Sequence, residues 1–185
     1  AMEYVDGYSL SELMMMARET KTALPTAFVA RVGIEICAAL TYAHEEAVDP
    51  EGNPLRVVHR DLSPHNVLVS KAGQVKITDF GIARVLGEAE SQLTASVVGK
   101  VAYMAPEVIR TNHFDTRADL FSFGVILWEL LTGDRLFHRD NPAAAALATY
   151  EAVAPPPSIK RPRLHARRND ICALALAREP EERAA

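Results

Sequence analysis

The chain has 185 residues, of which 49% are hydrophobic and 24% are charged, and its formal net charge is −4. This length and composition fit one folded domain with a sizeable core and exclude an intrinsically disordered protein. The slightly acidic balance gives no reason to expect nucleic acid as a partner.

The first half of the chain is predicted to hold a short strand and two helices. Residues 1–7 favour a strand that runs into a turn, and Ser9 with Glu12 three residues later is the capping-box pattern that begins a helix. Pro25 opens a longer helix, because apolar residues recur after it at helical spacing: Phe28, Val32, Ile36, Ala39, Leu40 and Ala43. Residues 49–54 are rich in turn formers and are predicted to form an insertion.

The middle of the chain favours a β-hairpin followed by a long loop. Residues 66–69 and 74–77 have strand character and are joined by a turn at 71–73. Periodicity fades from 84 to 99, where small polar residues collect. Because loops of this length in a compact domain are usually functional, we expect a function for this one.

The second half is predicted to be helical. A helix begins after Pro106, and residues 116–131 are apolar nearly all round, which is typical of a buried helix. Further helices are expected over about 143–153 and over 166–177. The fold class is therefore mainly α, with a small β-hairpin patch that carries polar motifs.

Cysteine usage and hydropathy bear on the compartment. Cys37 and Cys172 each lie inside an apolar helical pattern, so we expect two buried free thiols and a cytoplasmic, reducing location. We see no apolar run near the roughly 18 residues that span a bilayer and no signal peptide. No membrane contact is expected from this segment, although a longer parent chain could carry an anchor elsewhere.

Three motifs follow one another in a fixed order. Residues 59–66 read His-Arg-Asp-Leu-Ser-Pro-His-Asn, residues 79–81 read Asp-Phe-Gly, and residues 105–107 read Ala-Pro-Glu. One such tripeptide would recur by chance, but three in this order are not explained by coincidence. The chain resembles a eukaryotic-type Ser/Thr protein kinase of bacterial style, over the C-terminal lobe of that fold only.

The resemblance implies the residues that carry the chemistry. Asp61 would be the catalytic aspartate that accepts the substrate hydroxyl proton. Asn66 and Asp79 would hold Mg²⁺ on the phosphates of ATP, and carboxylate and amide oxygens are hard ligands that suit this ion. The plainer interpretation is a satisfied polar loop of an ordinary helical domain.

Residues 1–7 resemble the hinge that holds the adenine of ATP through backbone hydrogen bonds. Met2 would be the gatekeeper, Glu3 and Val5 would make the backbone contacts, and Leu68 would lie under the adenine ring. On composition alone these are ordinary core residues, so the assignment comes from the resemblance.

The resemblance also implies a phosphorylated activation loop. Ser96 is the first candidate phosphosite and Thr94 the second, and Arg60 with Arg84 would hold the phosphate through charge-assisted hydrogen bonds. The alternative is that both hydroxyls belong to an exposed loop without a regulatory role.

Other residues are expected to support the site structurally. Glu107 and Arg183 would form a buried ion pair, and His59 and Phe80 belong to the motifs that frame the site. Asp119 would accept hydrogen bonds from the backbone of the 59–66 loop. Its alternative role is a helix N-terminal acid that the helix dipole favours. Glu129 and Glu151 could face a peptide groove or lie on solvated helix faces.

The sequence departs from the family pattern at two positions. Ser/Thr kinases commonly have Lys two residues after the catalytic Asp, where this chain has Ser63, and Gly-Thr where it has Gly99-Lys100. We expect an exchange, in which Lys100 reaches back towards Asp61 and the γ-phosphate. The alternative is an exposed Lys100 in a weak or inactive enzyme.

The resemblance covers residues 1–185 as one lobe. The Gly-rich loop, the Val-Ala-Ile-Lys strand and the αC glutamate belong to an N-terminal lobe, which we expect as a partner in the parent chain, without which the fragment is expected to be inactive. The implied function is transfer of the ATP γ-phosphate to a protein substrate. A pseudokinase scaffold remains open, as does a small-molecule phosphotransferase of related fold, although such enzymes usually lack Ala-Pro-Glu.

Overall fold

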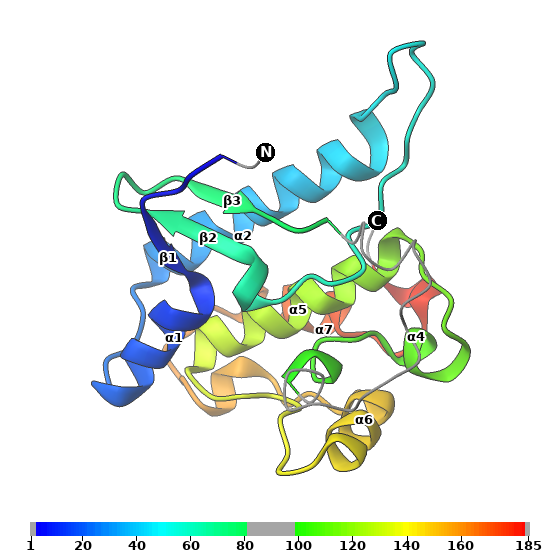
Figure 1. Ribbon diagram of the computed structural model, residues 1–185. Coiled ribbons are helices and arrows are strands. Elements are labelled where there is room, and N and C mark those ends of the chain that lie inside the picture. The colour runs from blue at the N-terminus through cyan, green and yellow to red at the C-terminus, as the bar shows by residue number, and fades with distance from the viewer. Residues whose placement is uncertain (1–2, 81–98, 184–185) are drawn as a thin grey trace.

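A computed structural model describes residues 3–80 and 99–183 as a helical body with one small sheet (Figure 1). The sheet is antiparallel, in the order β1 (Gly7–Ser9), β2 (Val67–Ser70) and β3 (Val75–Ile77). Gly7 lies opposite Ser70, and Val67 lies opposite Ile77. The first strand therefore lies slightly later than predicted. Its pairing brings the beginning of the chain against the hairpin that follows the 59–66 loop.

The helix α1 (Leu10–Glu19) begins with the predicted capping box. The Ser9 Oγ accepts the Glu12 N–H at 3.2 Å, and the Glu12 carboxylate accepts the Ser9 N–H at 2.7 Å. Two backbone donors at the start of the helix are thus satisfied by side chains. The capping box fixes the point at which β1 becomes α1.

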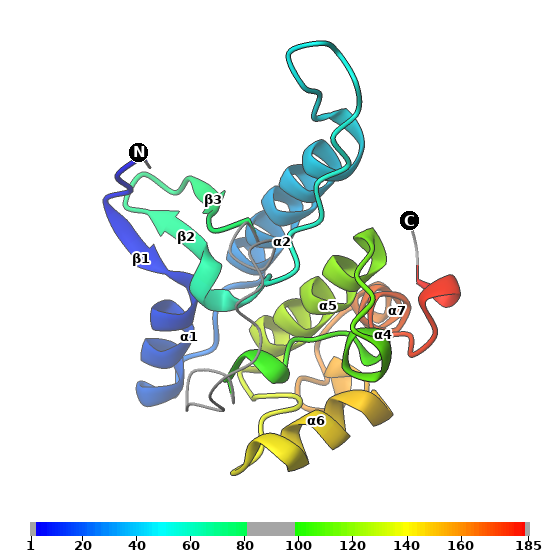
Figure 2. The ribbon, with the colours of Figure 1, turned by 45° about the vertical axis from the view of Figure 1, so that its right-hand side comes forward.

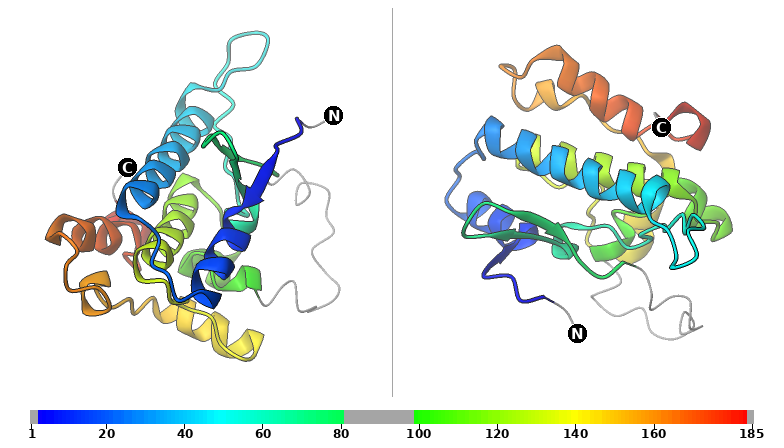
Figure 3. Two further views of the ribbon diagram at one scale, coloured as in Figure 1. Left: turned by 90° about the vertical axis from the view of Figure 1, so that its left-hand side faces the viewer. Right: turned by 90° about the horizontal axis from the view of Figure 1, so that it is seen from above.

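The helix α2 (Thr26–Thr41) continues into a π-helical turn, η1 (Tyr42–Glu46). Together they are 21 residues long, and an 18-residue window within them has a mean hydropathy of 1.4. By length and composition this helix could cross a membrane, so the expectation that no apolar run approaches that length is wrong. Its apolarity also has a structural cause, because its buried residues pack in the core beside α5 (Figure 3): Val29, Val32, Ile36 and Leu40. A helix in the core of a protein can be as long and as apolar as a helix that crosses a membrane.

The predicted insertion is an arm that extends beyond the end of α2 (Figure 2). Its two sides meet in a β-bridge between Val48 and Pro54. Inside the turn, Asp49 accepts the backbone N–H groups of Glu51 and Asn53 at 3.0 and 2.8 Å. An aspartate that accepts the backbone N–H groups after it is typical of a turn, and residues 49–54 were predicted to form an insertion because they are rich in turn formers.

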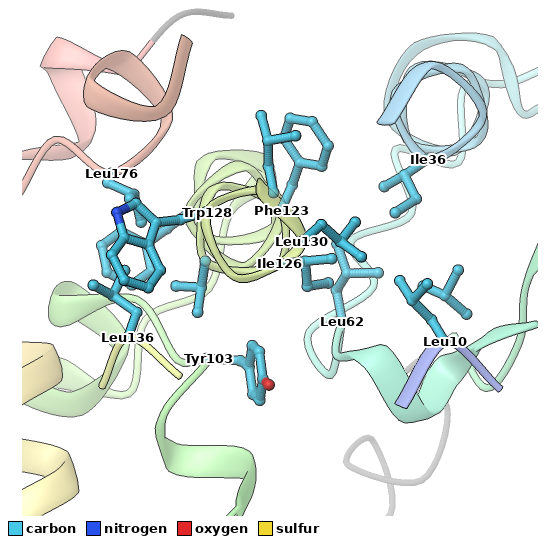
Figure 4. Close-up of a cluster of buried hydrophobic side chains, with 14 of the residues drawn as sticks. Leu10, Ile36, Leu62, Tyr103, Phe123, Ile126, Trp128, Leu130, Leu136 and Leu176 are labelled. Atoms are coloured by element: carbon cyan, nitrogen blue, oxygen red, sulfur yellow. The ribbon is translucent and has the colours of Figure 1, made fainter. Parts of the chain in front are cut away.

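The centre of the fold is α5 (Thr116–Thr132), which begins at an Asp115 cap and ends at Gly133 with φ +83°. Side chains from every direction pack against it (Figure 4), as its all-round apolar pattern predicted. Four further helical segments belong to the second half of the chain, and of these α7 packs directly on α5: α4 (Pro106–Thr111), α6 (Pro142–Glu151), α7 (Ala166–Ala175) and the short η5 (Pro180–Glu182). The other 3₁₀ turns are η2 (Pro64–Asn66) and η4 (Pro157–Ile159).

The two cysteines differ in environment. Cys172 is buried in α7, and burial raises the pKa of its thiol to about 12. Cys37 is exposed, so the prediction that both would be buried is wrong for this residue. The cause is helix geometry: the buried stripe of α2 includes Val32, Ile36 and Leu40, and Cys37 lies beside that stripe. Burial is therefore only partial, yet it still raises the pKa of Cys37.

Because α5 packs closely against α7, we expect a side chain at Gly124 to destabilise the fold. A Cβ there would lie 2.9 Å from Ala175 Cβ and 3.0 Å from Leu176 Cγ, whereas one at Gly33 on α2 would meet nothing closer than 3.9 Å. We expect Gly124→Ala to lower the free energy of unfolding by about 1–2 kcal/mol, because overpacking outweighs the gain in helix propensity.

The matched control is Gly33→Ala, which we expect to raise the free energy of unfolding by up to ~1 kcal/mol. Urea titration followed by circular dichroism measures both variants. Equal shifts in the same direction would show that α5 and α7 are not packed as closely as described.

Candidate active site

The 59–66 loop is anchored on α5 by one buried carboxylate. Asp119 is 1% exposed, and it accepts the backbone N–H groups of His59 at 2.7 Å and Arg60 at 2.9 Å. These hydrogen bonds are the ones expected for Asp119. A charge on so apolar a helix requires such partners, and here the partners are the backbone that presents Asp61.

A third contact on Asp119 was not expected from the sequence. The His44 Nε2 lies 2.8 Å from Asp119 Oδ2, and only 9% of the His44 side chain is exposed. His44 lies within the π-helical turn η1, which changes the direction of side chains relative to a regular α-helix. No 3.6-residue pattern indicates such a turn.

Asp61 lies close to Asn66, the last residue of this loop. The Asn66 Nδ2 donates to the Asp61 backbone oxygen at 2.8 Å and to Asp61 Oδ2 at 3.2 Å. Asp61 is partly exposed, with 25% of its side chain accessible, whereas Asn66 is 9% exposed. The carboxylate is therefore held by a neighbouring amide but remains accessible to a second molecule.

The β2–β3 hairpin brings Asp79 to the same end of the sheet as Asn66. The Thr78 N–H donates to the Asn66 backbone oxygen at 2.9 Å, and the His59 Nε2 lies 3.1 Å from the Thr78 oxygen. The His59 ring also contacts Phe80, with ring centroids 4.6 Å apart. Asp79 itself is exposed and has a left-handed backbone, φ +56°. His59 thus contacts the two residues that flank Asp79, Thr78 and Phe80.

The donor chemistry fits a divalent cation that is shared with a substrate. Both hydrogen bonds of the Asn66 side chain come from Nδ2, which leaves the amide oxygen available, and Asp79 adds an exposed carboxylate. Among the described residues, no group of three or more His, Cys, Asp or Glu could hold a metal alone. A Mg²⁺ ion with two protein ligands would complete its shell with water and phosphate oxygens.

Lys100 forms an ion pair with Asp61 of the 59–66 loop. Its Nζ lies 2.5 Å from Asp61 Oδ2, which is the approach expected from the sequence. The Lys100 side chain is 43% exposed. An ion pair open to water contributes at most ~1 kcal/mol, so this contact can break at little cost when another anion is offered.

Ser63, two residues after Asp61, has a buried side chain. It is 2% exposed, and among the described residues its Oγ has no hydrogen-bond partner. A cleft beside Asp61 is lined by Ser63, Lys100 and Tyr103, among others. Among the described residues, the site therefore combines a buried hydroxyl without a hydrogen-bond partner and a partly exposed cation beside one carboxylate.

The nucleotide residues expected from the resemblance lie along the sheet. Leu68 on β2 is half-buried between Ser9 and Lys76 of the neighbouring strands. Glu3 is exposed and pairs with the Lys76 ammonium group, and Val5 is half-buried. Met2 lies outside the described residues. The roles of these residues in nucleotide binding remain predictions.

The activation-loop assignments fall mostly outside the described residues. Arg84, Thr94 and Ser96 all lie there. Arg60 is described: it has a left-handed backbone, φ +67°, and its guanidinium lies over the Phe114 ring, 5.9 Å from the centroid. Arg60 thus belongs to the 59–66 loop and contacts Phe114, and its role in phosphate binding remains a prediction.

The expected ion pair of Glu107 and Arg183 is present and bidentate. The two distances are 2.6 and 2.8 Å, the Arg183 side chain is fully buried, and the Glu107 side chain is 10% exposed. Arg183 also donates to the backbone oxygens of Ala177, Arg117 and Arg178. The pair joins α4 to the end of the described chain.

Glu129 is not on a solvated face or in a peptide groove, contrary to both interpretations of the sequence. It is 1% exposed and accepts the Tyr103 hydroxyl at 2.9 Å and the Leu136 N–H at 3.1 Å, with Arg18 at 3.4 Å. Burial raises the pKa of Glu129, and the two hydrogen bonds oppose that shift. Burial likewise raises the pKa of Tyr103. An acidic residue within the apolar stretch 120–131 was the available signal.

The geometry defines a class of protein. A carboxylate on a loop anchored to a buried helix, an amide and a second carboxylate at one end of a hairpin, and a nearby lysine can together orient a hydroxyl and bind metal-bound phosphates. This is the arrangement of a phosphotransferase of the protein-kinase type.

Comparison with known proteins gives the same family. Residues 1–184 match the model of the protein kinase domain, and the chain belongs to this family. It is 40% identical over 182 residues to the tyrosine-protein kinase MasK of Myxococcus xanthus, covering 98% of this chain and 28% of that protein.

Two bacterial serine/threonine kinases are also similar. The probable serine/threonine-protein kinase PknB of Bifidobacterium longum is 36% identical over 184 residues, covering 98% of this chain and 25% of that protein. For the serine/threonine-protein kinase PknB of Mycobacterium tuberculosis the identity is 33% over 184 residues, with 98% and 27% coverage. The chain therefore spans roughly a quarter of the length of these relatives. The family to which it belongs consists of kinases that use ATP and phosphorylate proteins.

Proposed function

We propose that this chain is the C-terminal catalytic lobe of a Ser/Thr protein kinase, and that it transfers the γ-phosphate of ATP to protein Ser or Thr hydroxyls with Mg²⁺. The observation that carries the proposal is the set of contacts that presents Asp61: Asp119 holds the loop backbone, and Asn66 holds the carboxylate. A scaffold without activity would not require this carboxylate to be both fixed and accessible.

The residues divide the work as follows. Asp61 accepts a hydrogen bond from the acceptor hydroxyl and takes up its proton. The hydroxyl oxygen bonds to the γ-phosphorus as the bond from that phosphorus to the leaving oxygen of ADP breaks. Asn66 and Asp79 hold Mg²⁺, which neutralises charge on the phosphates when it is bound. Glu3, Val5 and Leu68 line the adenine side, and Met2 is assigned there from the sequence. The hinge residues bind through backbone groups, so their side chains can vary.

We also propose that this lobe works with an N-terminal lobe that covers the nucleotide. The support is the resemblance of residues 1–7 to a hinge and the greater length of the relatives. Activity assays therefore use the full-length protein that contains this segment.

Serine/threonine specificity is supported by the two PknB relatives, whereas MasK is named a tyrosine kinase. The test is to incubate the full-length protein with ATP, Mg²⁺ and a general protein acceptor and to map the phosphosites by mass spectrometry. We expect phosphoserine and phosphothreonine, including Ser96 or Thr94 of the kinase itself. Phosphotyrosine alone would show that the acceptor is tyrosine and not serine or threonine. ATP binding without any phosphate transfer would show that the protein is a pseudokinase.

A further inference from the structure

We propose that Lys100 is the phosphate-facing lysine of this kinase, that it replaces a lysine missing at Ser63, and that α5 positions it together with Asp61. The inference deepens the proposed function and rests on it. Its starting point is that the only cation in direct contact with Asp61 in the described part of the chain comes from a segment 39 residues away.

Ser63 supports the exchange of positions. It lines the same cleft as Lys100, it is buried, and its Oγ is without a hydrogen-bond partner among residues 3–80 and 99–183. A buried hydroxyl without a partner makes no contribution of its own to holding Asp61. The short side chain instead leaves the approach to Asp61 open on the side where Lys100 enters.

The backbone beside Lys100 is fixed to α5 at two points. The Tyr103 N–H donates to the Lys100 oxygen at 3.0 Å, and the Tyr103 oxygen accepts the Ser122 hydroxyl at 2.7 Å. The Tyr103 hydroxyl then donates to Glu129 at 2.9 Å. The turn that carries Lys100 is thus tied down through both the backbone and the side chain of Tyr103.

One face of α5 therefore positions both partners of the ion pair. Asp119, Ser122 and Glu129 are separated by three and seven residues, a spacing that puts side chains on one face of a helix. Asp119 fixes the loop that presents Asp61, and the other two fix the turn that presents Lys100. A buried helix serves as a common rigid reference for groups that are distant in sequence.

The charge at Lys100 is suited to leave Asp61 for a phosphate. The lysine is 43% exposed and has a flexible stem, so its ammonium can follow the γ-phosphate while its backbone remains fixed. A lysine that contacts only Asp61 would instead lower activity by masking the carboxylate. The two roles predict opposite results when Lys100 is replaced.

The first test compares Lys100→Met, Lys100→Arg and the control Lys160→Met in the full-length protein. Lys160 forms an exposed ion pair with Asp134, so its loss removes a similar charge without touching the site. We expect Lys100→Met to lower kcat about 100-fold with the KM for the protein acceptor unchanged, and Lys100→Arg to retain part of the activity. Wild-type kcat in Lys100→Met, or a rise, would overturn the inference.

A binding readout separates this inference from the proposed function. We expect Lys100→Met to weaken ATP binding relative to ADP by roughly tenfold, measured by calorimetry, because the lysine contacts the terminal phosphate. An unchanged ATP/ADP affinity ratio would contradict the role of Lys100. The ATP/ADP affinity ratio tests Lys100 independently of catalysis. If the wild type and Asp61→Asn transferred phosphate equally, the proposed function would be rejected, but the ratio would still test the role of Lys100.

The exchange itself is tested by moving the lysine. We expect the double variant Ser63→Lys/Lys100→Thr to transfer phosphate at least tenfold faster than Lys100→Thr alone. Thermal melting identifies variants that fail to fold, and the comparison is made between folded proteins. A folded double variant that is no faster than Lys100→Thr would show that the two positions are not equivalent.

Discussion

Asp119→Ala is expected to abolish phosphoryl transfer and to lower the free energy of unfolding by roughly 3–5 kcal/mol. The change removes the acceptor of the His59 and Arg60 backbone N–H groups and the partner of His44, all in a buried or partly buried place. The loop that carries Asp61 then loses its attachment to α5. Denaturant unfolding gives the stability change, and a phosphate-transfer assay on the full-length protein gives the activity.

The control for Asp119→Ala is Asp115→Ala at the start of the same helix. Asp115 caps α5 by accepting the Arg117 N–H at 2.8 Å, so its loss should cost about 1 kcal/mol of stability and leave transfer near the wild-type rate. If the two variants proved equally stable and equally active, Asp119 would be an ordinary helix N-terminal acid, and the anchoring role would be lost.

Glu107→Ala is expected to destabilise the fold by about 3–5 kcal/mol, because it leaves Arg183 charged and buried without its carboxylate. Three backbone oxygens still accept from Arg183, but they do not neutralise its charge. Thermal and denaturant unfolding measure the effect. The double variant Glu107→Leu/Arg183→Met removes both charges and should recover most of the lost stability.

Glu181→Ala provides the matched comparison for Glu107→Ala. Glu181 also pairs with an arginine, Arg117, at 3.2 Å, but 73% of its side chain is exposed. Exposed pairs contribute little, so a change within about 0.5 kcal/mol is expected. A loss as large as that of Glu107→Ala would mean that burial does not govern the strength of these two pairs.

The sequence was most informative where the signal is local. Ser9 with Glu12 predicted the start of α1, and the all-round apolar pattern predicted α5 and its burial. The turn residues between β2 and β3 predicted the hairpin. Each of these features depends on residues within a few positions of one another, so short-range patterns are sufficient.

Contacts between distant segments were accessible only through the family resemblance or not at all. Glu129 was misplaced because its partner Tyr103 lies 26 residues earlier and no pattern connects them. The His44 contact with Asp119 depends on a π-helical turn that periodicity does not reveal. Ser63 and Lys100 were visible in the sequence only as a pair of departures from the family pattern. The ion pair of Lys100 with Asp61 supports the proposed exchange between the two positions.

The most direct measurement is the phosphate content of the full-length protein after incubation with ATP and Mg²⁺, compared between the wild type and Asp61→Asn by intact-mass spectrometry. Asp61→Asn keeps the shape of the side chain but removes the carboxylate that takes up the hydroxyl proton. We expect the wild type to gain phosphate and the variant to gain none over the same period. Equal phosphate in both proteins would contradict catalysis by Asp61 and, with it, the proposed function.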